Sequence, residues 1–461
     1  MGEYEGSPGA AISGRGAARG AGDPASDAPR GGRGPTIQEM NELVAKAAAV
    51  KDASRQLART STDTKNSALL WIAAALRARA SDILAANARD CAAAVKSAQQ
   101  TGKDPLLDRL TLTDARLDAM ARDVDAVAEL PDPVGEEIER IVRPNGLIVT
   151  RRRVPLGVVG VVYESRPNVT SDIAALCIKT GNGVLLRGGS DALESNAEIV
   201  SAIKRGLEDG GLPSDAVALV GSSDRGLVHQ MLRLREYLDV IIPRGGEGLI
   251  RFVVDHATVP VIETGAGVCH TYVDRQADGA MALDVVFNAK VRRPTICNAL
   301  DTLLVHVDVA ADWLPKMAAR WVDAGVEIRA DRRAAAILDA RRIAHRPATD
   351  DDWGREFLSL VAAVKVVESM DEALQHIQRY GSGHSEAIVT GDEAAAERFV
   401  DEVDAAAVYV NASTQFTDGG EFGLGAEVGI STQKIHARGP MGLRELTTYK
   451  WVVLGSGQTR P

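Results

Sequence analysis

The sequence lacks the features that mark several large classes of protein. Four cysteines among 461 residues are too few for a disulfide framework, so reduced thiols in a cytosolic compartment are expected. No stretch approaches the roughly 18 consecutive apolar residues of a membrane helix. The N-terminus also lacks the apolar core of a secretory signal. We therefore expect a cytoplasmic protein with no membrane partner.

The sequence also contains fewer basic than acidic residues. The 53 Lys and Arg residues are outnumbered by 63 Asp and Glu residues, which gives a formal net charge of −10 and a pI of about 5.4. Nucleic acids are bound by clustered Lys and Arg, so no nucleic-acid partner is expected. The His, Cys and Asp residues show no zinc-site spacing, so no metal is expected. An apolar fraction of 45% can build large cores, and the length suits about two or three domains.

The first part of the chain divides into a tail and a helical section. Residues 1–35 are dominated by Gly, Ala, Pro and Ser, and such a segment cannot bury enough apolar surface to offset its ordering entropy. We predict a disordered tail there, with a start codon assigned too early as the other explanation. A capping box, Thr36-Ile-Gln-Glu39, then opens a helix. Helical runs continue to residue 130, so residues 36–145 are expected to be a helical layer of the domain that follows.

Two α/β domains are expected next. Residues 156–164 are continuously apolar, as in a strand of a buried parallel sheet. Alternating strands and helices follow to residue 267, including a helix over 224–238 and a strand over 259–264. This pattern predicts a doubly wound sheet with ligand crevices at the carboxyl ends of its strands. The second α/β domain is expected over residues 268–415, with strands at 302–309, 326–329, 358–367, 387–390 and 406–410.

The remaining segments differ from this alternation. Residues 146–154 and 446–454 read as exposed strands with one polar face, which pair with each other or with another subunit. An ordinary edge hairpin explains them equally well. Residues 416–441, within the C-terminal region 416–461, are glycine-rich and polar, and loops of this kind over an α/β core usually carry function.

Cys297 is the candidate nucleophile. It lies between a helical run, residues 277–293, and the strand expected at 302–309, on a turn that can face a cleft. Lys290, Arg292 and Arg293 are close in sequence, and neighbouring cations lower the pKa of a thiol. The alternative is a cysteine buried as a small hydrophobe.

Two glycine turns follow predicted strands. Backbone N–H groups of Arg187-Gly188-Gly189-Ser190 can approach a phosphate. An Arg at this place accommodates the 2′-phosphate of NADP, whereas Asp191 would either hold a ribose hydroxyl or cap the next helix. The second turn, Gly245-Gly246 after Arg244, is a further cofactor candidate or a purely structural turn.

Two polar residues stand at strand ends. Asn168 in Glu164-Ser-Arg-Pro-Asn168 presents an amide to a ligand or caps the following helix. Glu263 either acts as a general base with a raised pKa or is simply a carboxyl exposed at the end of a strand.

The assembled motifs resemble the gamma-glutamyl phosphate reductases (glutamate-5-semialdehyde dehydrogenases), a family of the aldehyde dehydrogenase superfamily. The resemblance covers roughly residues 36–455 and leaves out the tail. It rests on residues 154–168, 185–190, 241–246, 267–274, 293–298 and 422–442.

The resemblance implies a cofactor domain, a catalytic domain and a small oligomerisation sheet. It implies NADPH-dependent reduction of L-glutamyl 5-phosphate to glutamate 5-semialdehyde and phosphate, the second step of proline biosynthesis. Cys297 matches the nucleophile of the family, and Asn168 matches the Asn that stabilises the oxyanion. A homo-oligomer is expected, and so is a transient contact with glutamate 5-kinase, which would supply the unstable acyl phosphate. Candidate partners of the anionic substrate are Arg166, Lys434, His436 and Arg438, each of which is otherwise a surface charge.

Two rival functions stay open. The first is an NAD(P)-dependent aldehyde dehydrogenase that oxidises a free aldehyde to an acid with Glu263 as base. The second is a non-enzymatic nucleotide-binding α/β protein.

Overall fold

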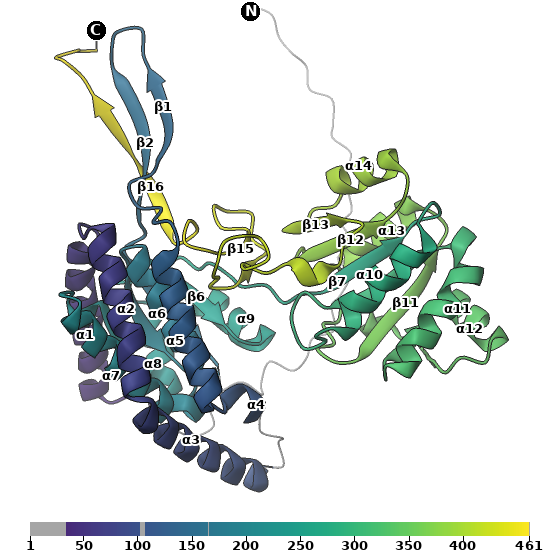
Figure 1. Ribbon diagram of the computed structural model, residues 1–461, viewed down its shortest axis with the longest axis horizontal. Coiled ribbons are helices and arrows are strands. Elements are labelled where there is room, and N and C mark those ends of the chain that lie inside the picture. Colours follow the sequence, from purple (N-terminus) through teal and green to yellow (C-terminus); the bar gives the residue numbers. More distant parts are fainter. Residues whose placement is uncertain (1–33, 102–106, 165, 461) are drawn as a thin grey trace, which may run out of the picture.

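The computed structural model describes residues 34–101, 107–164 and 166–460. They form two α/β lobes and a narrow β-arm that rises from the first lobe (Figure 1). The expected disordered tail lies outside the described residues except for its last two positions. Within the described ranges, no helix is long and apolar enough to cross a membrane.

The first lobe is built on a four-stranded parallel sheet in the order β5-β4-β3-β6. All residues of β3 are buried, and its side chains alternate between two hydrophobic cores because successive strand residues point to opposite faces. This confirms the predicted parallel sheet. Its strands are β3 (Val158–Tyr163), β4 (Gly183–Arg187), β5 (Val217–Leu219) and β6 (Val240–Arg244).

Helices cover both faces of this sheet. One face carries α2 (Thr62–Ala78), α5 (Asp114–Glu129), α6 (Pro167–Lys179) and α7 (Leu193–Asp209). The other carries the first half of α1 (Ile37–Leu57), with α8 (Arg225–Met231) and α9 (Glu247–His256). Two further helices, α3 (Ala80–Thr101) and α4 (Leu107–Leu110), complete the layer beside α7. The predicted capping box is present, since Thr36 Oγ1 accepts from the Glu39 N–H at 3.2 Å and the Thr36 N–H donates to the Glu39 carboxylate at 2.9 Å.

The second lobe contains a seven-stranded sheet in the order β10-β9-β11-β8-β7-β12-β13, with every neighbouring pair parallel. The five strands predicted here are present, and β7 and the short β10 are additional. The strands are β7 (Cys269–Val273), β8 (Leu300–His306), β9 (Glu327–Ala330), β10 (Arg346–Pro347), β11 (Val361–Val367), β12 (Ser385–Val389) and β13 (Ala407–Val410). The helices are α10 (Gly279–Val291), α11 (Val307–Asp323), α12 (Arg332–Ala340), α13 (Met370–Tyr380) and α14 (Glu393–Glu402).

The arm is a three-stranded antiparallel sheet in the order β1-β2-β16 (Figure 1). Its strands are β1 (Glu137–Val142), β2 (Ile148–Pro155) and β16 (Thr447–Leu454). The predicted pairing of the two distant strands is therefore confirmed. The helical expectation for residues 36–145 is wrong at β1, which pairs antiparallel with β2 and has a register shift between Glu137 and Glu139.

Two predicted elements of the first lobe are shorter than expected. The strand over 259–264 is reduced to one isolated bridge between Val261 and Ile241, because the next ladder bonds would need N–H groups of Pro260 on one side and Pro243 on the other. The helix over 224–238 ends at Met231, and turns follow it.

Between β13 and β16 the chain forms a long loop that returns towards the first lobe (Figure 1). Its only regular pairing within the described residues is the short hairpin of β14 (Ile430–Ser431) and β15 (Gly439–Pro440). Short 3₁₀ turns lie at Ser190–Ala192, Ser214–Ala216, Asp350–Asp352 and Thr414–Phe416.

Candidate active site at the Cys297 turn

Cys297 lies half-buried on the turn between α10 and β8, as predicted. The backbone of this turn is tightly enclosed. A Cβ atom added to Gly267 would lie 1.5 Å from the Cys297 carbonyl oxygen, and the buried Cys269 thiol donates to the same oxygen at 3.3 Å. The neighbouring residue, Asn298, donates from Nδ2 to the Thr417 carbonyl at 3.0 Å and accepts from Thr414 Oγ1 at 2.7 Å through its own carbonyl. The turn is thus held from β7 and from the C-terminal loop.

The expectation that Lys290, Arg292 and Arg293 lower the pKa of the Cys297 thiol is wrong. Loss of hydration raises the pKa of Cys297 to about 12, because burial disfavours the thiolate. Lys290 does not compensate, since its Nζ donates to the Leu300 carbonyl at 2.8 Å, and Arg292 points to Gln415 at 3.4 Å. The cation that favours the thiolate is Arg244, from the other lobe. Proximity in sequence did not predict which charges face the thiol.

Two carboxyls near the Cys297 thiol counteract the effect of Arg244 on its pKa. The charges of Glu356 and Glu427 raise the pKa of the Cys297 thiol further. Glu356 accepts from the Gly267 N–H at 3.0 Å, and Glu427 accepts from the Gly419 N–H at 2.9 Å. Burial raises the pKa of both carboxyls. The thiol therefore lies among ionisable groups that sequence reasoning did not identify.

Asn168 lies in the first turn of α6 with its side chain exposed. It is not the N-cap, which is Arg166, with Pro167 as the first helical residue. Its Nδ2 donates to Asp172 one turn later at 3.0 Å, which orients the amide. Burial raises the pKa of Asp172 to about 7. Because an amide has two N–H donors, Asn168 retains one for a ligand.

The turn after β4 is packed more closely than the sequence indicated. A Cβ at Gly188 would lie 2.2 Å from Asn196 Nδ2, so a larger residue there would displace the buried Asn196 side chain. Arg187 is buried, and it donates to the Gly188 carbonyl at 2.8 Å and to the Ser223 carbonyl at 3.3 Å. Its Nε is buried without a hydrogen-bond partner among the described residues. Ser190 begins a short 3₁₀ turn beside it. An unsatisfied guanidinium donor beside a glycine turn suits an anionic cofactor group.

The second glycine turn already faces an anion. The Gly246 N–H, at the N-terminus of α9, donates to the Glu164 carboxylate at 2.9 Å. A Cβ at Gly245 would lie 2.7 Å from the same carboxylate. The helix N-terminus thus has the geometry for an acceptor, which Glu164 provides within the chain.

Glu263 is bound on both sides by Gln433 of the C-terminal loop. The Glu263 N–H donates to Gln433 Oε1 at 2.9 Å, and Gln433 Nε2 donates to the Glu263 carboxylate at 2.8 Å. These bonds tie the loop to the first lobe and orient the Glu263 carboxylate through one of its two oxygens.

The other predicted substrate residues divide into two groups. Lys434 and Arg438 both form ion pairs with Asp404, the latter at 2.7 Å, and the His436 ring lies 3.3 Å from the Glu445 carbonyl. No hydrogen bond or ion pair in the described chain connects these three to the Cys297 turn. Arg166 is different, because its charge interacts with the Cys297 thiolate and with Arg244.

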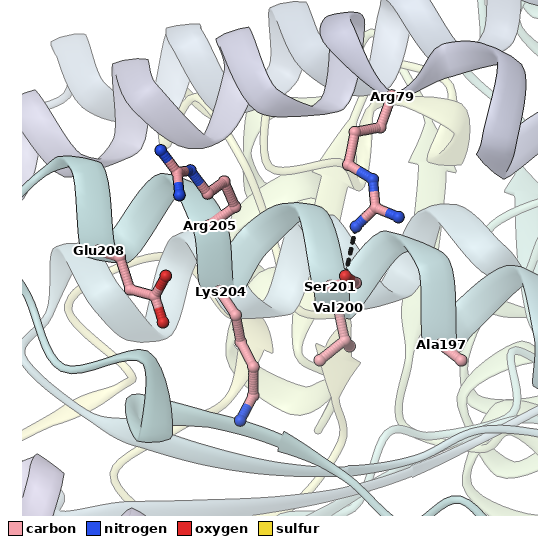
Figure 2. A pocket seen from close by; sticks show the side chains of 7 residues that line it. All are labelled: Arg79, Ala197, Val200, Ser201, Lys204, Arg205 and Glu208. Atoms are coloured by element: carbon pink, nitrogen blue, oxygen red, sulfur yellow. Dashed lines mark hydrogen bonds between the residues drawn. The ribbon is translucent and has the colours of Figure 1, made fainter.

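A separate surface hollow of about 560 Å³ runs along α7, where Arg79 donates to Ser201 and Lys204 points away from Arg79 (Figure 2). Each cation of its lining has an acidic partner: Arg79 pairs with Glu198 at 2.7 Å, Lys204 with Asp215 at 3.4 Å, and Arg205 with Asp209 at 2.8 Å. The lining holds no cysteine or histidine, and Ser201 donates to no general base among the described residues but accepts a hydrogen bond from Arg79, so the hollow does not compete with the Cys297 turn as an active site. Among the described residues, no three His, Cys, Asp or Glu side chains are grouped as metal ligands.

Known proteins match this chain over most of its length. The model of the aldehyde dehydrogenase family matches residues 34–345 and 347–452. Gamma-glutamyl phosphate reductase of Dehalococcoides mccartyi is 54% identical over 420 residues, which are 91% of this chain and 98% of that protein. The enzyme of the same name from Desulforamulus reducens is 55% identical over 412 residues, 89% of this chain and 97% of its own.

The fold is also similar to a solved structure. The crystal structure of gamma-glutamyl phosphate reductase from Thermotoga maritima superimposes with a TM-score of 0.87 at 50% identity, and the match covers 91% of this chain and 100% of that one. The similarity therefore extends over both lobes and the arm.

Proposed function

Since the chain belongs to the aldehyde dehydrogenase family and, within it, to the gamma-glutamyl phosphate reductases, we propose that it reduces L-glutamyl 5-phosphate to L-glutamate 5-semialdehyde and phosphate with NADPH. We further propose that Cys297 forms a thioester with the substrate and that the reaction is the second step of proline biosynthesis. The single observation that supports this chemistry best is the rigid, half-buried Cys297 turn, whose thiol is influenced by cations of the opposite lobe.

The first step is acyl transfer to the thiol. Sγ of Cys297 attacks the acyl carbon, an S–C bond forms, and the bond from that carbon to the phosphate oxygen breaks. Phosphate leaves with the electron pair. Burial favours the protonated thiol near neutral pH, and the thiolate is the attacking form, so the thiol proton must leave as the S–C bond forms and passes to the departing phosphate.

The tetrahedral intermediate places a negative charge on the former carbonyl oxygen. The Asn168 amide and the Cys297 backbone N–H are the donors we assign to it. A donor of this kind contributes about 3–4 kcal/mol in the transition state when it is held in place beforehand. Asp172 does this for Asn168 by accepting one amide hydrogen at 3.0 Å.

Members of the aldehyde dehydrogenase family use NAD(P), and when bound here it supplies the hydride that converts the thioester to the aldehyde. The residues that would hold it are Arg187, Gly188, Gly189 and Ser190 at the end of β4, with Gly245 and Gly246 at the N-terminus of α9. The buried, unsatisfied Nε of Arg187 supports a preference for NADPH. Binding a phosphate at α9 requires Glu164 to move from the Gly246 N–H.

We propose that the substrate's other anionic groups are bound by Arg166 and, after release from Asp404 and Glu445, by Lys434, His436 and Arg438. We also propose that the protein works in the cytoplasm and receives its substrate from glutamate 5-kinase. The arm supports a homo-oligomer, because Tyr449, Trp451 and Val453 each expose about half of their surface on it.

The rival aldehyde oxidation needs a base that activates water. Glu263 is the residue that would do this, and Gln433 holds its carboxylate at 2.8 Å. This contact gives the hydrolytic alternative no support.

The decisive assay is NADPH oxidation with freshly generated glutamyl phosphate, compared with other acyl phosphates. In the reverse direction, semialdehyde oxidation should require phosphate. Cys297→Ala should abolish turnover and leave NADPH binding, followed by fluorescence, unchanged. Phosphate-independent oxidation, or turnover by the alanine variant, would contradict the proposal.

A further inference from the structure

Arg244 joins the first lobe to the C-terminal loop. It is the last residue of β6, and its carbonyl accepts from the Glu164 N–H at 3.1 Å. Its guanidinium lies against Gly429 of the loop, where an added Cβ would be 2.4 Å from Nη1 and 2.9 Å from Cζ. Gly429 has a φ of 153°, which favours glycine independently of this contact. The loop thus passes directly over the guanidinium.

This half-buried guanidinium has no acidic partner. No carboxylate of the described chain lies within ion-pair distance of Arg244, and no hydrogen bond from its guanidinium is found there. By contrast, Arg438 and Arg153 of the same region pair with Asp404 and Glu136 at 2.7 and 3.0 Å. Partly buried charges are normally paired, so a cation without a partner indicates an anionic ligand.

Further cations gather at the same place. The positive charges of Arg109, Arg244 and Arg293 all act on Arg166, and Arg244 and Arg166 both interact with the Cys297 thiol. None of the four arginines has an ion pair within the described residues. They come from α4, from the strand ends of the first lobe and from the Cys297 turn. The charge of Arg244 acts on Glu427 and Asp172, and that of Arg109 acts on Glu356, but none of these carboxyls lies within ion-pair distance, so an anionic ligand can still lie between the guanidinium groups.

We propose that Arg244 binds the phosphoryl group of an acyl phosphate at the Cys297 thiol, and inorganic phosphate in the reverse reaction. This proposal rests on the proposed function. A guanidinium can donate two parallel hydrogen bonds to phosphate oxygens and neutralise charge as the C–O bond breaks. Arg244 then selects acyl phosphates over free aldehydes and acids, which lack the phosphoryl group.

The test uses inorganic phosphate and an alkylating agent, without turnover. Phosphate bound to Arg244 covers the thiol, so it should slow alkylation of Cys297 by iodoacetamide, followed by mass spectrometry. Arg244→Met should remove this protection, and Arg244→Lys should retain part of it. Arg251→Met, on the exposed side of α9, is the control and should behave as the wild type.

A second readout is the KM for phosphate during semialdehyde oxidation. It should rise about 10- to 100-fold in Arg244→Met, the loss expected for hydrogen bonds to a charged group. Gly429→Ala should have the same effect with the arginine present, because its Cβ displaces the guanidinium. Absence of phosphate protection in the wild type, or unchanged protection and KM in both variants, would overturn the inference. If phosphate protects the wild type but glutamyl phosphate is not reduced, the proposed function fails and the phosphate site stands.

Discussion

Gly267→Ala is the sharpest test of how the nucleophile is positioned. The added Cβ would lie 1.5 Å from the Cys297 carbonyl oxygen and 2.5 Å from its carbonyl carbon. Both are backbone atoms, so no side chain can rotate away. The clash is relieved only if the Cys297 turn or the segment before β7 moves by more than 1 Å, since ordinary contacts begin near 3.4 Å.

Such a displacement should be costly for the reaction. Misplacing a reacting group by about 1 Å lowers the rate roughly 100-fold. We expect kcat to fall by at least that factor with saturating substrate, and the free energy of unfolding to fall by about 1–3 kcal/mol from overpacking. The Gly267 N–H bond to Glu356 and the Cys269 bond to Cys297 are then strained as well.

The matched control is Gly279→Ala, at the exposed start of α10 in the same lobe. Its Cβ would meet only Trp313, at an ordinary 3.5 Å. We expect wild-type kcat and an unchanged unfolding midpoint for it. A kcat within twofold of the wild type in Gly267→Ala would refute the argument that this turn is held rigidly for catalysis.

Three further predictions concern the amide, the thiol and the arm. Asn168→Ala should lower kcat about 100- to 1000-fold with little change in KM, and an unchanged kcat would remove it from the oxyanion site. Because the thiol pKa is raised to about 12, alkylation of Cys297 in the protein alone should increase about tenfold per pH unit between pH 6 and 9, and a plateau near neutral pH would contradict the effect of burial. Replacing both Tyr449 and Trp451 with Ser should lower the molar mass measured by light scattering, since exposed aromatic area stabilises association, and an unchanged mass would place the subunit contact elsewhere.

Local patterns predicted most of the secondary structure correctly. The capping box at Thr36, the apolar run of β3 and the strands of the second lobe depend on side-chain spacing, which the sequence contains directly. Errors occurred where a single residue interrupts a pattern or where a strand is short. The apolar run around Pro260 favoured a strand, but prolines interrupt its hydrogen bonding. The short strand β1 lies within the region that was predicted to be helical.

The site was predicted less completely. The sequence proposed Cys297, Asn168 and the two glycine turns because each follows or precedes a strand. Arg244 could have been found by the same argument, since it stands immediately before Gly245. Glu356, Glu427 and Gln433 carry no local signal, because they reach the site on loops whose course depends on the packing of both lobes.

The sequence by itself determined the two α/β domains, the two arm strands and the turn that carries Cys297, since these follow from periodicity and from residues adjacent in the chain. Only the tertiary structure decided that the arm strands pair with each other and which groups surround Cys297. Charge and hydration act through space, so the lysine and arginines beside Cys297 in sequence left its thiol pKa high, while Arg244, more than fifty residues away, is the cation that faces it.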